Sequence, residues 1–347
     1  MTNSVRAMGP PALLFAGILL AQAAAQSPQK TPGESQAIKL QVEMVSLQVV
    51  VTTREGRRVL DLKKEDFQVF EDGIEQQIAG FGQTDEPVSV LLALDTSGST
   101  ELQLPRIQNE AIRFCNLLHP DDSVAVMSFA EDVNLLEDWS IDRDRNAYGI
   151  KETRPGGWTV LYEAVWLALE EVLKPLQERS ALVLFTDGVD TASRKASRKE
   201  TIELAKETRA TIYPIYFNTE YDRQRSIGRP TVQGLPVPGY PPVVVNPMPP
   251  GGRGTGWEDY AAGRAYLSEL AEYTGGRVFD ALQMQDLGPA FEEIARELSS
   301  QYSIGYYSTN TKRDGKFRRT EVRIRKPGMT ARTKKGYYAP REDKKKR

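Results

Sequence analysis

The chain has 347 residues, of which 40% are hydrophobic and 27% charged, a composition typical of a globular protein. Its 45 lysines and arginines nearly balance its 47 aspartates and glutamates, so overall charge favours neither a nucleic acid nor a membrane surface. The single cysteine, Cys115, excludes an internal disulfide, and we expect a buried, unreactive thiol there. At this length we expect one large domain and one smaller domain.

The first residues have the pattern of an export signal. Arg6 precedes an apolar segment over 11–20, and small residues follow as far as Ala25, where a signal peptidase would cut. We therefore predict a signal peptide over 1–25 and an irregular lead-in over 26–37. The protein is expected to be exported, whether periplasmic, associated with the cell envelope or secreted. No later segment approaches the ~20 apolar residues of a transmembrane helix, so none is expected in the mature chain.

Strand patterns dominate two regions, 38–86 and 301–340. Apolar and polar residues alternate in both regions, and Asp72-Gly73 is a hairpin signal in the first. We predict that the two regions pair into one small β module, followed by a basic tail over 341–347. The expected strands are 38–53, 66–70, 74–78, 302–307, 318–325 and 330–338.

Between 87 and 300 the pattern changes to buried strands that alternate with amphipathic helices. This alternation is typical of a doubly wound α/β domain with a mostly parallel, six-stranded sheet. Two of the strands are separated by only a few residues and must form an antiparallel hairpin, because a parallel pair needs a long crossover. The expected strands are 88–94, 123–129, 133–139, 181–186, 211–217 and 276–279, and the expected helices are 102–118, 143–151, 160–173, 198–209, 260–273 and 286–300.

An insertion rich in proline and glycine, over 220–257, interrupts this alternation. It follows a strand, so we expect it to overhang the carboxyl edge of the sheet, where open α/β sheets bind ligands. It is either a proline-rich spacer, or a lid or partner-recognition loop. In the second case Glu220, Asp222 and Trp257 are the candidate contacts.

Two of the buried strands end in an acid. Asp95 ends the first and is followed by Ser97 and Ser99 in a turn made possible by Gly98. Asp187 ends the strand at 181–186, and we expect the two strands on either side of the point where strand order reverses. A third hydroxyl comes from Thr159, which closes a Gly-Gly loop. Hard oxygen atoms with few carboxylates favour Mg²⁺, with Mn²⁺ or Ca²⁺ as alternatives.

Together these segments resemble the metal-ion-dependent adhesion site of a von Willebrand factor A domain. The resemblance implies that Ser97, Ser99 and Thr159 bind the cation directly, and that Asp95 and Asp187 act directly or through water. It also implies that an acidic residue of a protein partner completes the coordination. The two flanking regions further resemble exported bacterial proteins grouped as VWFA-related, through segments such as Asp66-Phe-Gln-Val-Phe-Glu-Asp-Gly and Lys335-Gly-Tyr-Tyr-Ala-Pro.

Enzymatic alternatives lack the residues that they need. The segment Asp95-Thr-Ser differs from the Asp-Thr-Gly of aspartic proteases, no Gly-x-Ser-x-Gly elbow exists, and His119 is the only histidine. We predict a non-enzymatic binding protein that engages an acidic group on a protein partner through a divalent cation. The alternatives are an envelope-associated scaffold whose metal only stabilises the fold, and adsorption to anionic surfaces through basic residues between Arg318 and Arg347.

Overall fold

The computed structural model describes residues 44–83, 86–217 and 256–341. The expected signal peptide, the lead-in, most of the 220–257 insertion and the end of the basic tail lie outside the described residues. Among the helices that are described, none has the length and apolar character needed to cross a bilayer.

A six-stranded sheet lies at the centre of the α/β domain, in the strand order β10-β9-β8-β5-β6-β7. All neighbouring strands are parallel except β6 and β7, which form the predicted antiparallel hairpin. The fold class predicted from the sequence is therefore confirmed. The strands are β5 (Ser89–Asp95), β6 (Ser123–Phe129), β7 (Val133–Ser140), β8 (Ser180–Thr186), β9 (Thr211–Phe217) and β10 (Phe279–Ala281).

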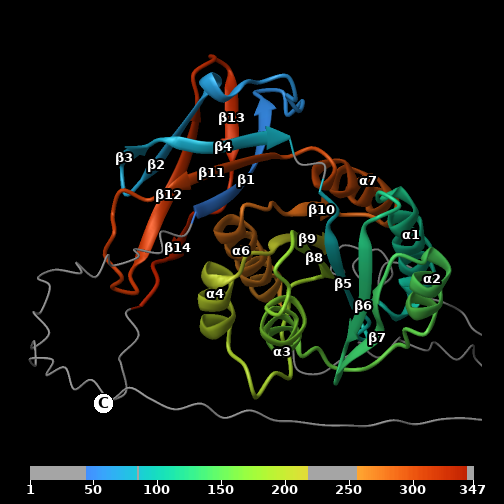
Figure 1. Ribbon diagram of the computed structural model, residues 1–347. Coiled ribbons are helices and arrows are strands. Elements are labelled where there is room, and N and C mark those ends of the chain that lie inside the picture. The colour runs from blue at the N-terminus through green and yellow to red at the C-terminus, as the bar shows by residue number, and fades with distance from the viewer. Residues whose placement is uncertain (1–43, 84–85, 218–255, 342–347) are drawn as a thin grey trace, which may run out of the picture. The chain divides into compact units, whose positions relative to one another are not determined.

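Helices cover both faces of this sheet (Figure 1). One face packs against α1, α2 and α7, and the other against α3, α4 and α6. The helices are α1 (Leu104–Leu117), α2 (Arg143–Lys151), α3 (Leu161–Leu167), α4 (Arg198–Glu207), α6 (Trp257–Thr274) and α7 (Leu287–Leu298), with short 3-10 turns η2 (Glu101–Gln103) and η4 (Met284–Asp286).

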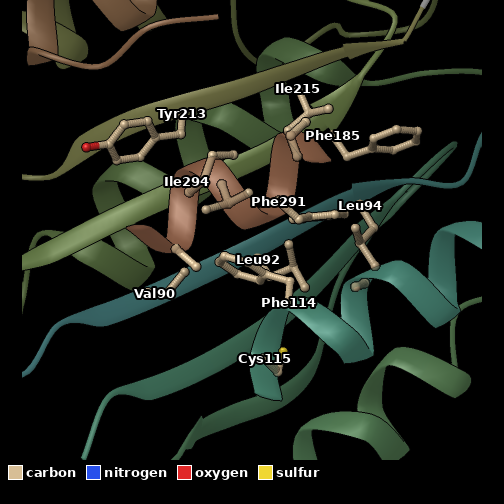
Figure 2. Packing of buried hydrophobic residues seen from close by; sticks show 14 of the residues in the cluster. Val90, Leu92, Leu94, Phe114, Cys115, Phe185, Tyr213, Ile215, Phe291 and Ile294 are labelled. Carbon is tan, nitrogen blue, oxygen red and sulfur yellow. The ribbon is translucent and has the colours of Figure 1, made fainter. Parts of the chain in front are cut away.

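Strand β5 is buried along its whole length, which explains its apolar sequence. Val90, Leu92 and Leu94 point to the face covered by α1 and α7, while Leu91 and Ala93 point to the opposite face. Figure 2 shows the first cluster, in which Cys115 is also enclosed. The prediction of a buried thiol is confirmed, and burial raises the pKa of Cys115 to about 12.

The N- and C-terminal flanks pair with each other, as predicted. They form two four-stranded sheets, with the orders β13-β1-β11-β4 and β14-β12-β2-β3. Pairing across the ends of the chain joins β1 to β11 and β2 to β12. The strands are β1 (Met44–Thr53), β2 (Phe67–Glu71), β3 (Ile74–Gln76), β4 (Ile78–Gln83), β11 (Tyr302–Tyr307), β12 (Phe317–Ile324), β13 (Met329–Arg332) and β14 (Gly336–Tyr338), with the 3-10 turn η1 (Lys64–Asp66) before β2.

Four expected elements differ from the structure. The strand predicted over 330–338 is two strands, because β13 pairs with β1 in one sheet and β14 pairs with β12 in the other. The strand predicted over 74–78 is likewise divided, with β3 in one sheet and β4 in the other. A continuous alternation of apolar residues therefore concealed a change of pairing partner.

The other two differences lie in the α/β domain. The helix predicted over 160–173 continues after α3 as a π-helical segment, η3 (Ala168–Leu173). Strand β10 begins at Phe279 rather than at residue 276. Gly275, with a left-handed φ of +82°, caps α6, and the N–H of Gly276 still donates to the carbonyl of Ala271 in that helix, so the strand begins only after this cap.

Candidate metal centre

Asp95 stands at the point where the strand order of the large sheet reverses. Strand β5 lies between β8 and β6, so the chain moves to one side of β5 first and returns to the other side later. Asp95 is the last residue of β5, and Asp187 follows the last residue of β8. The two acids therefore follow adjacent parallel strands, as the sequence predicted.

The turn after β5 brings one carboxylate and two hydroxyls together. Asp95 Oδ1 accepts hydrogen bonds from the backbone N–H of Ser97 at 3.0 Å and from its hydroxyl at 2.6 Å. The hydroxyl oxygens of Ser97 and Ser99 are 3.2 Å apart. Thr100 stabilises the turn, because its hydroxyl donates to the carbonyl oxygens of both Asp95 and Ser97.

Thr186, the last residue of β8, is a site residue that the sequence analysis did not single out. Its hydroxyl donates to Asp95 Oδ2 at 2.7 Å and accepts from the backbone N–H of Gly188 at 3.1 Å. This contact links the two central strands through the carboxylate itself. The sequence feature that could have identified Thr186 is a hydroxyl residue at the end of an otherwise apolar strand.

Thr159 follows a loop that hydrogen-bonds to the turn after β5, and Thr159 itself hydrogen-bonds to the segment after β8. In the preceding loop, Gly156 N–H donates to the carbonyl of Thr96, and the carbonyl of Gly157 accepts from Gly98 N–H at 3.2 Å. After β8, the Thr191 hydroxyl accepts from the backbone N–H of Thr159 at 2.8 Å. The carbonyl of Thr159 also accepts from two backbone N–H groups of that segment, at 191 and 192. Thr191 is a second residue that the sequence analysis missed.

Asp187 is buried, and its Oδ1 accepts from the backbone N–H of Val189 at 3.0 Å. The next residue, Gly188, has a φ of +79°, and a Cβ there would lie 2.8 Å from the carbonyl carbon of Gly263 on α6. Glycine is therefore required at both positions, because the backbones of the turn and of α6 touch. This contact holds α6 against the segment that carries Asp187.

The carboxylate of Asp95 is fully buried, with an exposed fraction of 0%. Burial raises its pKa above the usual range, while the hydrogen bonds from Ser97 and Thr186 act in the opposite direction. Among the described residues no lysine, arginine or histidine forms an ion pair with Asp95. A buried carboxylate without a cationic partner is costly, so a bound cation would stabilise this arrangement.

The donor set fits a small divalent cation. Ligands 2.0–2.1 Å from Mg²⁺ at adjacent octahedral positions are about 2.9 Å apart, close to the Ser97–Ser99 oxygen separation of 3.2 Å. Since the Ser97 hydroxyl donates its proton to Asp95, its oxygen accepts from the Ser99 hydroxyl and keeps one lone pair for a cation. No cluster of three or more His, Cys, Asp or Glu side chains occurs in the described part of the chain, so a metal here would depend on hydroxyl ligands.

Other acids with a possible ligand role have structural partners instead. Asp190 accepts from the backbone N–H of Tyr162 in the first turn of α3 and from the hydroxyl of Ser193. Asp122 accepts from the backbone N–H groups of Val88 and His119. Both aspartates therefore act as a cap or in a turn.

Of the predicted partner contacts, only Trp257 is described. It begins α6 and is 73% exposed, whereas Glu220 and Asp222 lie outside the described residues. Most of the basic residues that the structure describes between 318 and 341 form ion pairs. Arg318 is buried against Glu71, and Lys335 pairs with Glu272 on α6. These two residues therefore do not supply the unpaired positive charge that adsorption to anionic material would need.

The comparisons with known proteins agree with this architecture. Residues 90–189 match the family model of the von Willebrand factor type A domain. The part of the α/β domain that carries the acid-and-hydroxyl turn is thus similar to the von Willebrand factor type A domain. No curated protein matches the sequence.

Several solved structures resemble the chain at low sequence identity. The vWF domain of the type V pili tip protein Mfa5 from Porphyromonas gingivalis is 13% identical over 61% of this chain and 95% of that one, with a TM-score of 0.44. The conserved hypothetical protein BatB from Bacteroides thetaiotaomicron is 19% identical over 61% and 97%, with a TM-score of 0.40.

Proximal thread matrix protein 1 from the mussel byssus, in a structure with a zinc-occupied MIDAS motif, is 16% identical over 65% of this chain. The TM-score is 0.43, and the match spans 49% of the length of that protein.

Proposed function

We propose that this chain is an exported, non-enzymatic binding protein whose von Willebrand factor type A domain holds a divalent cation. Ser97, Ser99 and Thr159 would bind the cation directly, and Asp95 and Asp187 would hold it directly or through water. Mg²⁺ suits this set of oxygen ligands best, and Mn²⁺ or Ca²⁺ are alternatives. When bound, the cation supplies positive charge and an open coordination position for an acidic group of a protein partner.

The observation that carries this proposal is the fully buried carboxylate of Asp95. It accepts hydrogen bonds from Ser97 and Thr186 but has no cationic side chain beside it within the described residues. The serine hydroxyls stand at the spacing of adjacent ligands. Buried charge of this kind is normally paired or bound to a metal.

Cation binding is tested by titrating the chelator-treated protein with Mg²⁺, Mn²⁺ and Ca²⁺ in a calorimeter. We expect binding by the wild type and its loss in Ser97→Ala. Ser89→Ala is the matched control, since Ser89 has the same side chain at the opposite end of β5 and contacts Ser123. Equal cation binding by Ser97→Ala and the wild type would show that the cation lies elsewhere.

The scaffold alternative is tested by comparing stability with partner capture. A cation that binds only the folded state raises the unfolding free energy by about 2.7 kcal/mol at 100 times its dissociation constant. We expect Mg²⁺ both to raise the melting temperature and to increase the capture of envelope or secreted proteins by the immobilised chain. An increase in melting temperature alone would favour a scaffold whose metal only stabilises the fold.

A further inference from the structure

Two large apolar side chains lie exposed beside the candidate metal centre. Leu102 is 92% exposed in η2, and Trp158 is 45% exposed between Gly157 and Thr159. Single exposed apolar residues are common on protein surfaces. These two differ because the local backbone places both near Ser99, an exposed residue that is a proposed ligand.

The turn after β5 places Leu102 beside Ser99. Thr100 N–H donates to the carbonyl of Ser97, and Gln103 N–H donates to the carbonyl of Thr100, both at 2.9 Å. These two bonds close two consecutive turns, of which Ser99 lies in the first and Leu102 in the second. The exposed side chain of Leu102 therefore stands only three residues after Ser99.

A backbone contact brings the loop that carries Trp158 close to the turn that carries Ser99. Gly98 N–H donates to the carbonyl of Gly157 at 3.2 Å, and a Cβ on Gly98 would lie 3.3 Å from the same oxygen. Ser99 and Trp158 each follow one of these glycines directly. Because consecutive Cα atoms are 3.8 Å apart, the Cα atoms of Ser99 and Trp158 lie at most about 13 Å apart.

Two carboxylates near Trp158 and Leu102 further restrict the partners that the site can bind. A Cβ on Gly157 would lie 2.5 Å from the Oε1 atom of Glu131, so this carboxylate lies against the loop that carries Trp158. Glu101 is exposed next to Leu102. Two carboxylates at the rim repel a partner segment with several acidic residues, whereas one acid can be neutralised by the cation.

From this arrangement we propose that the site recognises a single glutamate or aspartate flanked by aromatic or large aliphatic residues. The proposal rests on the proposed function, because the acid is held by the cation. Leu102 and Trp158 bury the flanking apolar side chains, and exposed tryptophans that become buried are typical anchors of protein interfaces. Glu101 and Glu131 discriminate against runs of acidic residues.

The test uses three fluorescently labelled tripeptides with blocked ends, Phe-Glu-Phe, Gly-Glu-Gly and Glu-Glu-Glu. Their affinities for the full chain are measured by fluorescence anisotropy in Mg²⁺ and in chelator. We expect Phe-Glu-Phe to bind at least tenfold more tightly than the other two in Mg²⁺, and to lose this binding in chelator. Leu102→Ser and Trp158→Ser should each reduce the ratio of Phe-Glu-Phe to Gly-Glu-Gly affinity at least threefold.

Matched controls separate a local effect from a general one. Leu117→Ser, at the opposite end of α1, and Tyr148→Ser, on α2, remove exposed side chains of similar size and should leave the ratio unchanged. Equal affinities of Phe-Glu-Phe and Gly-Glu-Gly in Mg²⁺ would overturn the inference while leaving the cation-binding function intact. A Phe-Glu-Phe preference that persists in chelator would also overturn it. Failure of the chain to bind Mg²⁺ in the calorimeter would instead overturn the proposed function.

Discussion

The hydroxyl of Thr186 donates a 2.7 Å hydrogen bond to the buried carboxylate of Asp95, across the two central strands of the sheet. A carboxylate with an exposed fraction of 0% loses much of its stabilisation when one donor is removed. We expect Thr186→Val to lower the unfolding free energy in chelator by about 1–3 kcal/mol. Thr186→Ser keeps the hydroxyl and should lose less than half as much. Urea denaturation measures both, and equal losses would show that the hydroxyl is not what matters.

The close approach of Gly188 to Gly263 gives a second prediction. Gly188→Ala places a Cβ at a left-handed φ and 2.8 Å from the carbonyl carbon of Gly263. We expect a loss of at least about 2 kcal/mol of unfolding free energy, since the left-handed conformation alone costs an alanine about 1–2 kcal/mol. Mg²⁺ affinity should fall as well, because Asp187 is the preceding residue. Gly82→Ala is the control, because no atom lies within 4 Å of the added carbon.

The ion pair between Glu71 and Arg318 joins β2 to β12 inside the β module. Arg318 is 4% exposed and its Nη1 lies 3.3 Å from Glu71 Oε1, while the Tyr306 and Tyr337 hydroxyls donate to Oε2. Arg318→Met leaves the buried carboxylate without its cation. We expect a loss of about 3–5 kcal/mol, measured by chemical denaturation.

The matched control for this pair is Arg57→Met. Arg57 pairs with Glu55 at 3.8 Å, and both side chains are mostly exposed. Exposed pairs contribute about 0–1 kcal/mol, so the control should hardly change stability. Similar losses in the two variants would contradict a special role for burial.

Lys334 provides a prediction for pH dependence. Burial, with a smaller effect from Arg209, lowers its pKa to about 8, and its Nζ donates to the carbonyl of Thr208 at 3.3 Å. The unfolded chain therefore binds this proton more tightly than the folded chain. The buried lysine therefore lowers the unfolding free energy by its full amount below pH 8. This effect disappears as the pH rises toward about 10.4, the pKa of a lysine in the unfolded chain.

We compare the unfolding free energy of Lys334→Met with that of the wild type at two pH values. The variant's advantage over the wild type should be about 1–3 kcal/mol larger at pH 7 than at pH 10.5. Measuring the difference between the two proteins cancels the other groups that titrate in this range. Lys312→Met, at an exposed position, should show no such change with pH. A wild-type minus Lys334→Met difference that is constant from pH 7 to pH 10.5 would rule out the lowered pKa.

The sequence by itself determined the order of strands and helices in the α/β domain and the strand character of the two flanks. These features follow from periodicity, because burial on one face or on both leaves a repeating pattern of apolar residues along each segment. The turn over Asp95, Ser97 and Ser99 was equally visible, since its residues are neighbours in the chain.

Only the tertiary structure decided which segments pair and which polar groups meet. The alternation over 330–338 is continuous, yet β13 and β14 belong to different sheets because their partners, β1 and β12, come from opposite parts of the chain. Arg318 looked like part of a basic surface until its pairing with Glu71 was known. The local sequence pattern predicts whether a side chain is buried. Which residue that side chain contacts depends on segments that are far apart in sequence. Thr186 illustrates this limit, because its donor role exists only when β8 lies beside β5.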